Sequence, residues 1–97
     1  MPANNSLLAE HPIPQVVLDR MARLTLDQCL HLVYRLLLNR PPDDSGWSTF
    51  SSLLQGENRP DLLISWIVDS FEFHALHGVE RLKNFYSFVE RAGTLDL

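Results

Sequence analysis

The chain has 97 residues, which suffice for one domain with one hydrophobic core and leave too little for a second. Hydrophobic residues make up 45% of it and charged residues 21%, a composition typical of a folded protein and unlike that of a disordered one. Twelve acidic against eight basic residues give a formal net charge of −4, which argues against general attraction to nucleic acid or to an anionic membrane surface.

Residue usage and hydropathy predict a soluble, cytoplasmic chain. Cys29 is the single cysteine, so no internal disulfide demands an oxidising compartment. No segment approaches the ~18 uninterrupted apolar residues that cross a bilayer, and the first residues lack the basic start and apolar run of a signal peptide. We therefore expect no membrane insertion.

The first part of the chain predicts an arm followed by two helices. Residues 1–14 are mostly polar and end in two closely spaced prolines, a pattern typical of an N-terminal arm. Apolar residues at helical spacing predict a first helix over residues 15–24. Thr25 followed by Gln28 has the pattern of a capping box and predicts the start of a second helix, over residues 26–38.

The second helix is predicted to end in a polar corner that starts the next helix. Pro41 and Pro42 cannot donate backbone hydrogen bonds, and Asn39 tolerates the left-handed conformation that often ends a helix. Asp43 or Asp44 can then accept hydrogen bonds from the first free amides of a third helix. The residues that we assign to this structural corner are Asn39, Arg40, Pro42, Asp43 and Gly46.

Three further helices are predicted after the corner. The third ends at Gly56, the fourth begins at Pro60, and the fifth lies between Gly78 and Gly93. No strand-like alternation competes, so we expect an all-α fold, a compact bundle of about five short helices in a single domain over residues 15–97. The residues predicted to face the core are Trp47, Phe50 and Leu54 on the third helix, Leu63, Trp66, Ile67 and Phe71 on the fourth, and Val79, Leu82, Phe85, Tyr86 and Val89 on the fifth.

A longer pattern runs through the corner and the two helices after it. Its residues, in chain order, are Tyr34-Arg35, Leu38, Arg40, Pro42-Asp43, Gly46, Phe50, Leu54, Gly56, Ser70 and Glu72-Phe73. The pattern resembles a bacterial helical domain of unknown function that is related in pattern to the phycobilisome linker domain. It covers about 40 residues, and it departs from that family at Asn39, where glycine is usual, and at Trp47, where a smaller apolar residue is usual.

The resemblance implies a helical module without enzymatic activity of its own. Such domains are found beside glycosyltransferases, methyltransferases and secreted calcium-binding repeat proteins. Asn39 preserves the backbone conformation that glycine would supply, whereas Trp47 changes the side chain offered to any partner.

Arg40 is predicted to brace the corner. It lies close in sequence to Asp43, and it can reach Glu72 if the third and fourth helices fold back. A guanidinium between two carboxylates forms charge-assisted hydrogen bonds, so a structural clamp is the favoured interpretation. Arg35 follows a tyrosine predicted to lie in the core, and the sequence leaves open whether Arg35 faces solvent or a partner.

No metal or cofactor is expected. A calcium-loop pattern starting at Asp43 fails, because its glycine position falls on Ser48 and its glutamate position on Leu54. Only His74 and His77 among the four histidines are close enough to share a helical face, and a pair of histidines does not make a zinc site. We expect the histidines to be exposed or to cap helices.

Neither catalysis nor nucleic-acid binding is supported by the residues present. Cys29 lies on a broad apolar helix face, where cysteine usually serves as a small core residue, and Ser45 lacks the strand that precedes a nucleophile elbow. The helix after Asp43 contains no Arg or Lys with which to contact a DNA groove. We therefore expect no enzyme and no nucleic-acid partner.

Binding to another protein is the remaining interpretation. Aromatic residues are numerous, and Phe73 and Phe88, which lie off the main stripe of their helix, are candidates for exposure and partner contact. The candidate contacts are Arg35, Trp47, Phe73 and Phe88. We expect a non-catalytic interaction or scaffolding module, which the resemblance places in cell-surface polysaccharide or glycan assembly. The partner is either a second copy or an enzyme or scaffold, and the alternative is an accessory subunit that adds surface to an enzyme's active site.

Overall fold

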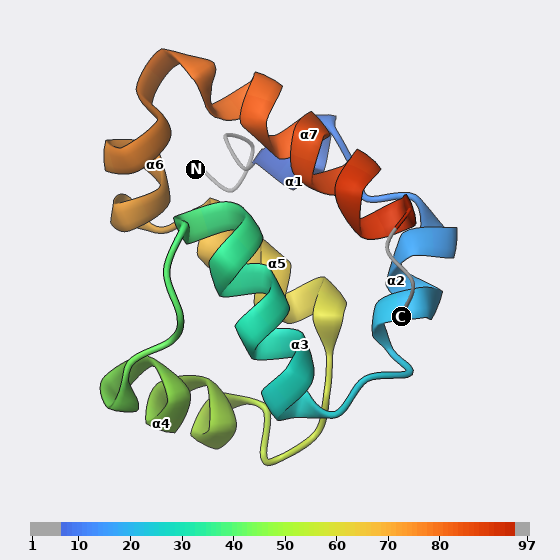
Figure 1. Cartoon of the computed structure of the whole chain (residues 1–97), viewed down its shortest axis with the longest axis vertical. Coiled ribbons are helices and arrows are strands. Elements are labelled where there is room, and N and C mark those ends of the chain that lie inside the picture. Colours follow the sequence, from blue (N-terminus) through green and yellow to red (C-terminus); the bar gives the residue numbers. More distant parts are fainter. Residues whose placement is uncertain (1–6, 95–97) are drawn as a thin grey trace.

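Helix α3 (Leu26–Val33) lies at the centre of the fold (Figure 1). The predicted capping box starts it: Gln28 N–H donates to Thr25 Oγ1 over 3.1 Å, and Thr25 N–H donates to Gln28 Oε1 over 3.0 Å. Its buried face continues into η2 (Tyr34–Leu38), which has the wider turns of a π-helix. The helix predicted over residues 26–38 is therefore confirmed, while its wider last turns were not foreseen.

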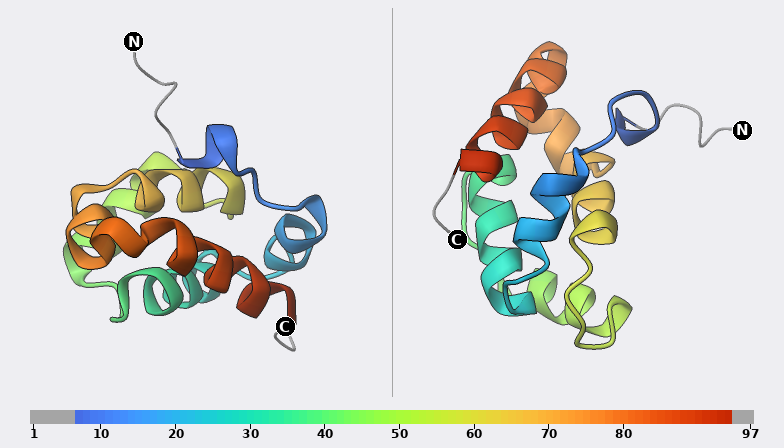
Figure 2. Two further views of the ribbon diagram at one scale, coloured as in Figure 1. Left: turned by 90° about the horizontal axis from the view of Figure 1, so that it is seen from above. Right: turned by 90° about the vertical axis from the view of Figure 1, so that its right-hand side faces the viewer.

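Three further helices each contribute several buried residues to the core. They are α2 (Gln15–Met21), α5 (Pro60–Val68) and α7 (Arg81–Thr94). The right-hand view of Figure 2 shows α2 between α5 and α7, and α2 packs against both. The computed structural model describes residues 7–94, and every regular element in that range is helical, as predicted. The largest fully buried side chains are Phe73, Phe85, Phe88, Met21, Leu30, Leu37, Leu63, Ile64 and Ile67.

Helix α4 (Asp44–Leu53) lies at the edge of the molecule, at the bottom of Figure 1. None of its own residues is buried, and Leu54 just after it is the first residue of this segment to enter the core. The inward stripe predicted for this helix is therefore wrong at Trp47, which is exposed, and only partial at Phe50, which is half-buried.

An unpredicted break separates α5 from helix α6 (Phe71–His77). Ser70 caps the new helix, because its hydroxyl accepts a hydrogen bond from Phe73 N–H over 3.2 Å. The predicted fourth helix ran through Phe71 without this break. Restarting the helix changes which side chains face inward, so Phe71 is 87% exposed whereas Phe73 is buried.

The buried face of the last helix differs from the predicted one. A short 3₁₀ turn, η3 (Gly78–Glu80), precedes α7 and leaves Val79 on the surface. The buried residues of α7 are Phe85, Phe88 and Ala92, so Leu82 and Tyr86, both predicted inward, are exposed. Gly93 lies within α7 and does not end it.

The described part of the predicted arm packs on the domain. It contains a one-turn helix, α1 (Leu7–Glu10), and both Leu8 and Ile13 contact the core. His11 Nδ1 lies 2.6 Å from the Tyr86 hydroxyl, which attaches this segment to α7. Residues 1–6 of the arm lie outside the described residues. No helix in the described range has the length and apolar character to cross a membrane.

Candidate functional site

The predicted corner has the local geometry expected from its residues. Asn39 ends η2 in the left-handed conformation, with a φ of 59°. Asp43 caps α4, because its Oδ1 accepts a hydrogen bond from Gly46 N–H over 2.7 Å. Of the two aspartates considered for the cap, Asp43 is thus the one used, and Pro42 lies half-buried in the connecting segment.

Arg40 braces this corner, as predicted. Its Nε and Nη2 each donate a hydrogen bond of 2.7 Å to the carboxylate of Glu72 on α6, a bidentate pair. Its Nη1 donates to the Pro41 carbonyl over 3.1 Å and lies 4.0 Å from Asp43. The hydrogen bonds from Arg40 lower the pKa of Glu72 below its ordinary value of 4.5.

Tyr34 fills the space beneath the corner. The guanidinium of Arg40 lies 5.1 Å from the centre of the Tyr34 ring, and burial of the ring raises the pKa of its hydroxyl. Gly46 packs directly on this side chain, since a Cβ built on Gly46 would overlap the Tyr34 hydroxyl. The corner therefore requires glycine at this position for reasons of space, which spacing in the sequence does not reveal.

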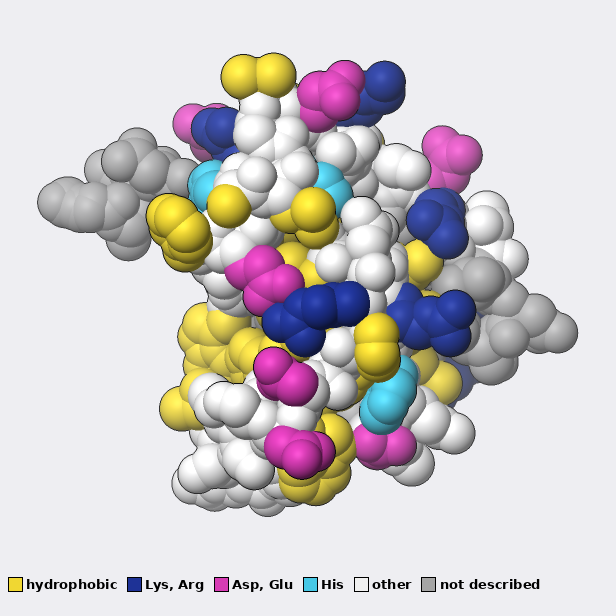
Figure 3. Space-filling view, turned by 60° about the vertical axis from the view of Figure 1, so that its left-hand side comes forward, with side chains coloured by type: hydrophobic (Ala, Val, Ile, Leu, Met, Phe, Trp, Pro, Cys, Tyr) yellow, Lys and Arg dark blue, Asp and Glu magenta, His cyan; other side chains and the backbone are white. Residues whose placement is uncertain are grey.

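Large apolar side chains remain partly exposed on α4 and α5. Trp47 is 40% exposed, and its indole N–H donates to Asp27 on α3 over 2.8 Å. Phe50 stacks on Trp66 of α5 with ring centres 6.0 Å apart, and Leu53 is 57% exposed one turn further along α4. We call these four residues (Trp47, Phe50, Leu53 and Trp66) the aromatic surface. Figure 3 shows hydrophobic side chains in the lower part of the molecule, where α4 lies.

Two of the predicted partner contacts are wrong. Phe73 is fully buried, where its ring centre lies 4.5 Å from that of His77, and Phe88 is 1% exposed. The break before α6 and the offset of α7 turn both side chains into the core. Of the four candidates, Trp47 and Arg35 are on the surface.

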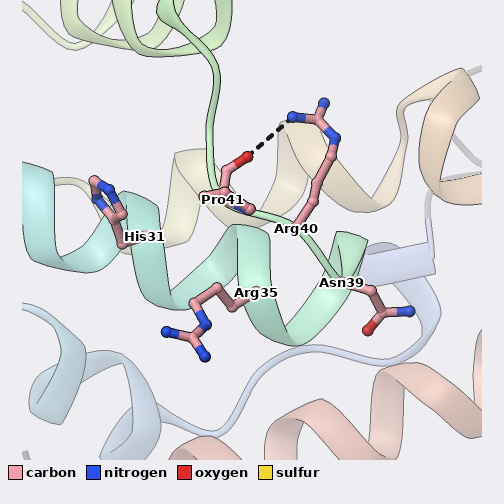
Figure 4. A pocket seen from close by; sticks show the side chains of 5 residues that line it. All are labelled: His31, Arg35, Asn39, Arg40 and Pro41. Atoms are coloured by element: carbon pink, nitrogen blue, oxygen red, sulfur yellow. Dashed lines mark hydrogen bonds between the residues drawn. The ribbon is translucent and has the colours of Figure 1, made fainter.

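Arg35 lines a shallow groove that the sequence did not reveal. A depression of about 430 Å³ lies beside His31, Arg35, Asn39, Arg40 and Pro41 (Figure 4). A second of about 440 Å³ shares His31 and Arg35 with it, and adds Leu32, Leu36 and Arg91. Leu36 and Arg91 also help to line a third depression, of about 300 Å³, which lies between η2, α6 and α7. We call these three adjoining depressions the arginine groove.

The two free arginines of the groove come from helices far apart in the sequence. In Figure 4, the side chains of Arg35 and Arg40 extend to opposite sides of their segment, with Arg40 next to the connection to α4. Arg91 of α7 lines the same depression as Arg35. No described residue forms a hydrogen bond or ion pair with the side chain of Arg35 or Arg91, in contrast to Arg40. Figure 3 shows a band of Lys and Arg side chains, with acidic side chains gathered at one end of it.

Cys29 and His77 both interact with groups inside the fold. Burial raises the pKa of the Cys29 thiol to about 12, and the neighbouring Asn58 amide lowers it by a smaller amount. His77 bridges elements, since its Nε2 lies 2.5 Å from the Leu37 carbonyl and its Nδ1 accepts from Asn84 over 2.8 Å. Among residues 7–94, no group of three or more His, Cys, Asp or Glu side chains is arranged to hold a metal ion.

Comparisons with protein-family models, with curated proteins and with solved structures found no match to this chain. The resemblance to the bacterial helical domain therefore stays a prediction. Two surfaces of the described residues offer contacts to a partner, the aromatic surface and the arginine groove.

Proposed function

We propose that the chain is a non-catalytic protein-interaction module whose aromatic surface binds another protein. One observation carries the proposal: α4 presents three large apolar side chains, although no residue of that helix is buried. An amphipathic helix normally buries its apolar face against its own domain. On α4 much of that face remains available to a partner.

The residue types of the aromatic surface suit an interface. Tryptophan is enriched among the residues that contribute most to binding, and exposed apolar patches on soluble domains often mark contact sites. Trp47 is held by its hydrogen bond to Asp27, and Trp66 by stacking on Phe50. Because both rings are already positioned, less side-chain entropy is lost when a partner covers them.

Helix α4 also has little intrinsic stability of its own. Its sequence contains Ser45, Gly46, Ser48, Thr49, Ser51 and Ser52, residue types with modest or poor helix propensity. It depends on the Asp43 cap and on a few ring contacts at its edge. Elements of low local stability are commonly those that bind ligands or partners. A partner seated on α4 would add the packing that the domain does not supply.

The biological setting of the proposal comes from the resemblance alone, which suggests cell-surface polysaccharide or glycan assembly. The partner is a second copy of the chain or another protein of that machinery. Co-purification from the native host identifies which, and light scattering after gel filtration measures self-association.

Replacing Leu53 by glutamate tests the aromatic surface. Leu53 is exposed, so Leu53→Glu leaves the core intact while it places a charge in the proposed interface. Val79→Glu is the matched control, because Val79 is a 98% exposed apolar residue outside the aromatic surface. We expect Leu53→Glu to weaken capture of the partner, or self-association, by about tenfold or more, and Val79→Glu to change it by less than about twofold.

Two results would overturn the proposal. One is that Leu53→Glu captures the partner as well as the wild-type chain does, or self-associates to the same molecular mass. The other is equal loss with both variants, which would show a general effect of added charge. Circular dichroism of both variants establishes that the helices remain folded, so that loss of binding reports on the surface.

A further inference from the structure

We infer that the arginine groove binds an extended acidic peptide segment of a partner protein. The starting observation is its charge. Among the described residues, no Asp or Glu lines any of its three depressions, whereas Arg35, Arg40 and Arg91 do. This arrangement stands out in a chain whose formal net charge is −4.

The cations that are free to bind are Arg35 and Arg91. Arg40 is engaged with Glu72, so its charge is largely compensated. Arg35 and Arg91 form no side-chain hydrogen bond or ion pair with a described residue, and both are exposed. A guanidinium offers a planar fork of donors that matches a carboxylate in bidentate fashion. Each arginine can therefore receive one carboxylate of a ligand.

The groove is shaped for a chain rather than for a small molecule. Its depressions hold about 300 to 440 Å³ each and adjoin through shared lining residues, so they form one open path. Small-molecule sites instead enclose most of their ligand's surface. The half-buried Leu32 and Leu36 give the middle of the path an apolar floor beneath the two arginines.

The spacing of the lining residues favours an extended segment. His31 lies on α3 four residues before Arg35, a separation that places two side chains about 6 Å apart along an α-helix. In an extended peptide, every second side chain points the same way, with a repeat of about 6.6 Å. Acidic residues at every second position would thus meet successive polar positions of the groove.

The groove also adjoins the aromatic surface. Asp27 Oδ1 accepts the hydrogen bond from Trp47 and lies 3.5 Å from His31 Nδ1, so one residue contacts both regions. One partner can therefore cover both. This inference rests on the proposed function in taking the occupant to be a protein, but it depends on different side chains.

Binding of a labelled peptide tests the inference. The probe is a fluorescein-labelled peptide with glutamate at every second position and alanine between, and fluorescence anisotropy measures its affinity for the full chain. We expect Arg35→Gln/Arg91→Gln to weaken binding by about tenfold or more. The control Arg23→Gln/Arg81→Gln removes the same charge from exposed positions outside the groove, and we expect a change below about twofold.

Two further measurements define the ligand class. A peptide with the same number of glutamates at every third position directs neighbouring carboxylates to opposite sides, and we expect it to bind more weakly. Inorganic phosphate should compete only at concentrations far above those of the peptide. Equal binding of the two peptides, or displacement by phosphate at concentrations near the peptide's Kd, would overturn the acidic-peptide assignment.

The outcomes separate this inference from the proposed function. Leu53→Glu should leave peptide binding unchanged, because Leu53 does not line the groove. Absence of peptide binding, together with loss of the native partner on Leu53→Glu, would overturn the groove alone. Equal affinity of the two double variants would also overturn it. Peptide binding that depends on Arg35 and Arg91, with a partner unaffected by Leu53→Glu, would overturn the aromatic surface alone.

Discussion

Arg40 joins three separate parts of the chain through one side chain. It bonds Glu72 on α6, the Pro41 carbonyl in the connecting segment and the face of the Tyr34 ring on η2. The pair with Glu72 is bidentate, which sets it apart from a loose surface ion pair. Its partial exposure limits the energy, because water screens the attraction.

Replacing Glu72 by glutamine should lower the free energy of unfolding by about 1 kcal/mol near neutral pH. The pKa of Glu72 is depressed in the folded protein by its hydrogen bonds with Arg40. The stabilisation is therefore fully present above the ordinary pKa of a glutamate and is lost as pH falls through the depressed value. Urea unfolding of wild type and Glu72→Gln should show a difference near pH 7 that shrinks as the pH falls below the ordinary pKa of glutamate and through the lowered pKa of Glu72.

Glu80→Gln is the matched control for this experiment. Glu80 lies 3.9 Å from Lys83 in an ion pair whose two side chains are mostly exposed. Its replacement removes the same charge and should change stability by less than about 0.5 kcal/mol. Equal effects of the two variants would show that the Arg40–Glu72 geometry contributes nothing beyond a surface pair.

At the level of elements, contacts at the first turn of α4 hold this helix to the domain more than burial of its side chains does. The Asp43 cap and the close fit of Gly46 against Tyr34 fix where the helix begins. The remainder contacts the domain through rings that are only partly buried. A change at the first turn should therefore affect the whole helix.

Gly46→Ala should destabilise the protein by about 1 to 2 kcal/mol, although alanine favours helices by roughly 1 kcal/mol over glycine. The added methyl would overlap the Tyr34 hydroxyl. Tyr34→Phe removes that oxygen, so the cost of Gly46→Ala should be smaller in the Tyr34→Phe background. Thermal or urea unfolding of the four proteins in this double-mutant cycle measures the coupling.

Gly93→Ala supplies the comparison. Gly93 lies within α7, and a Cβ there would meet only Val17 Cγ2 at an ordinary distance of 3.5 Å. We expect Gly93→Ala to leave stability unchanged or to raise it by up to about 1 kcal/mol. Stabilisation by Gly46→Ala to the same degree would contradict the proposed close fit.

The sequence alone predicted the helix ends that depend on residues close together in the chain. The capping box at Thr25, the left-handed exit at Asn39 and the cap at Asp43 each involve groups within a few residues. The helix start at Ser70 was not predicted, because the apolar residues around it continue the spacing of the preceding helix through Phe71. Missing that restart misplaced Phe73, and the later helix start likewise misplaced Phe88.

The surfaces were less predictable than the elements. Arg35 was recognised as a candidate contact, but its neighbour in the groove, Arg91, lies on a distant helix, and no local spacing connects the two. Trp47 was expected inward by periodicity and is exposed because α4 sits at the edge of the fold. The pair of Arg40 with Glu72 was an exception among long-range contacts, since both residues belong to the pattern that runs through the corner.

At the scale of the whole molecule, the core is built from nearly every helix and centres on α3. Cys29 lies in it fully buried, together with Val33 of the same helix and Phe85 of α7. Burial accounts for the raised pKa of the Cys29 thiol, about 12, so the reactive thiolate is scarce in the native protein.

Cys29 should therefore label with a thiol reagent only when the domain unfolds. In native buffer we expect labelling at least about a hundredfold slower than for Ser52→Cys in a Cys29→Ala background, since Ser52 is exposed. With increasing urea, Cys29 labelling should rise along with the loss of helical circular dichroism. Rapid labelling of Cys29 in native buffer would contradict its burial in a closed core.

The packing of α2 against α7 brings together the first and last long helices of the described chain. During synthesis, the ribosome releases α2 well before α7. Until α7 emerges, Val17 and Met21 lack the helix that covers them, and the core lacks Phe85, Phe88 and Ala92. A nascent chain stalled before α7 therefore exposes apolar surface that chaperones recognise, and the fold can close only when nearly all of the described residues have left the exit tunnel.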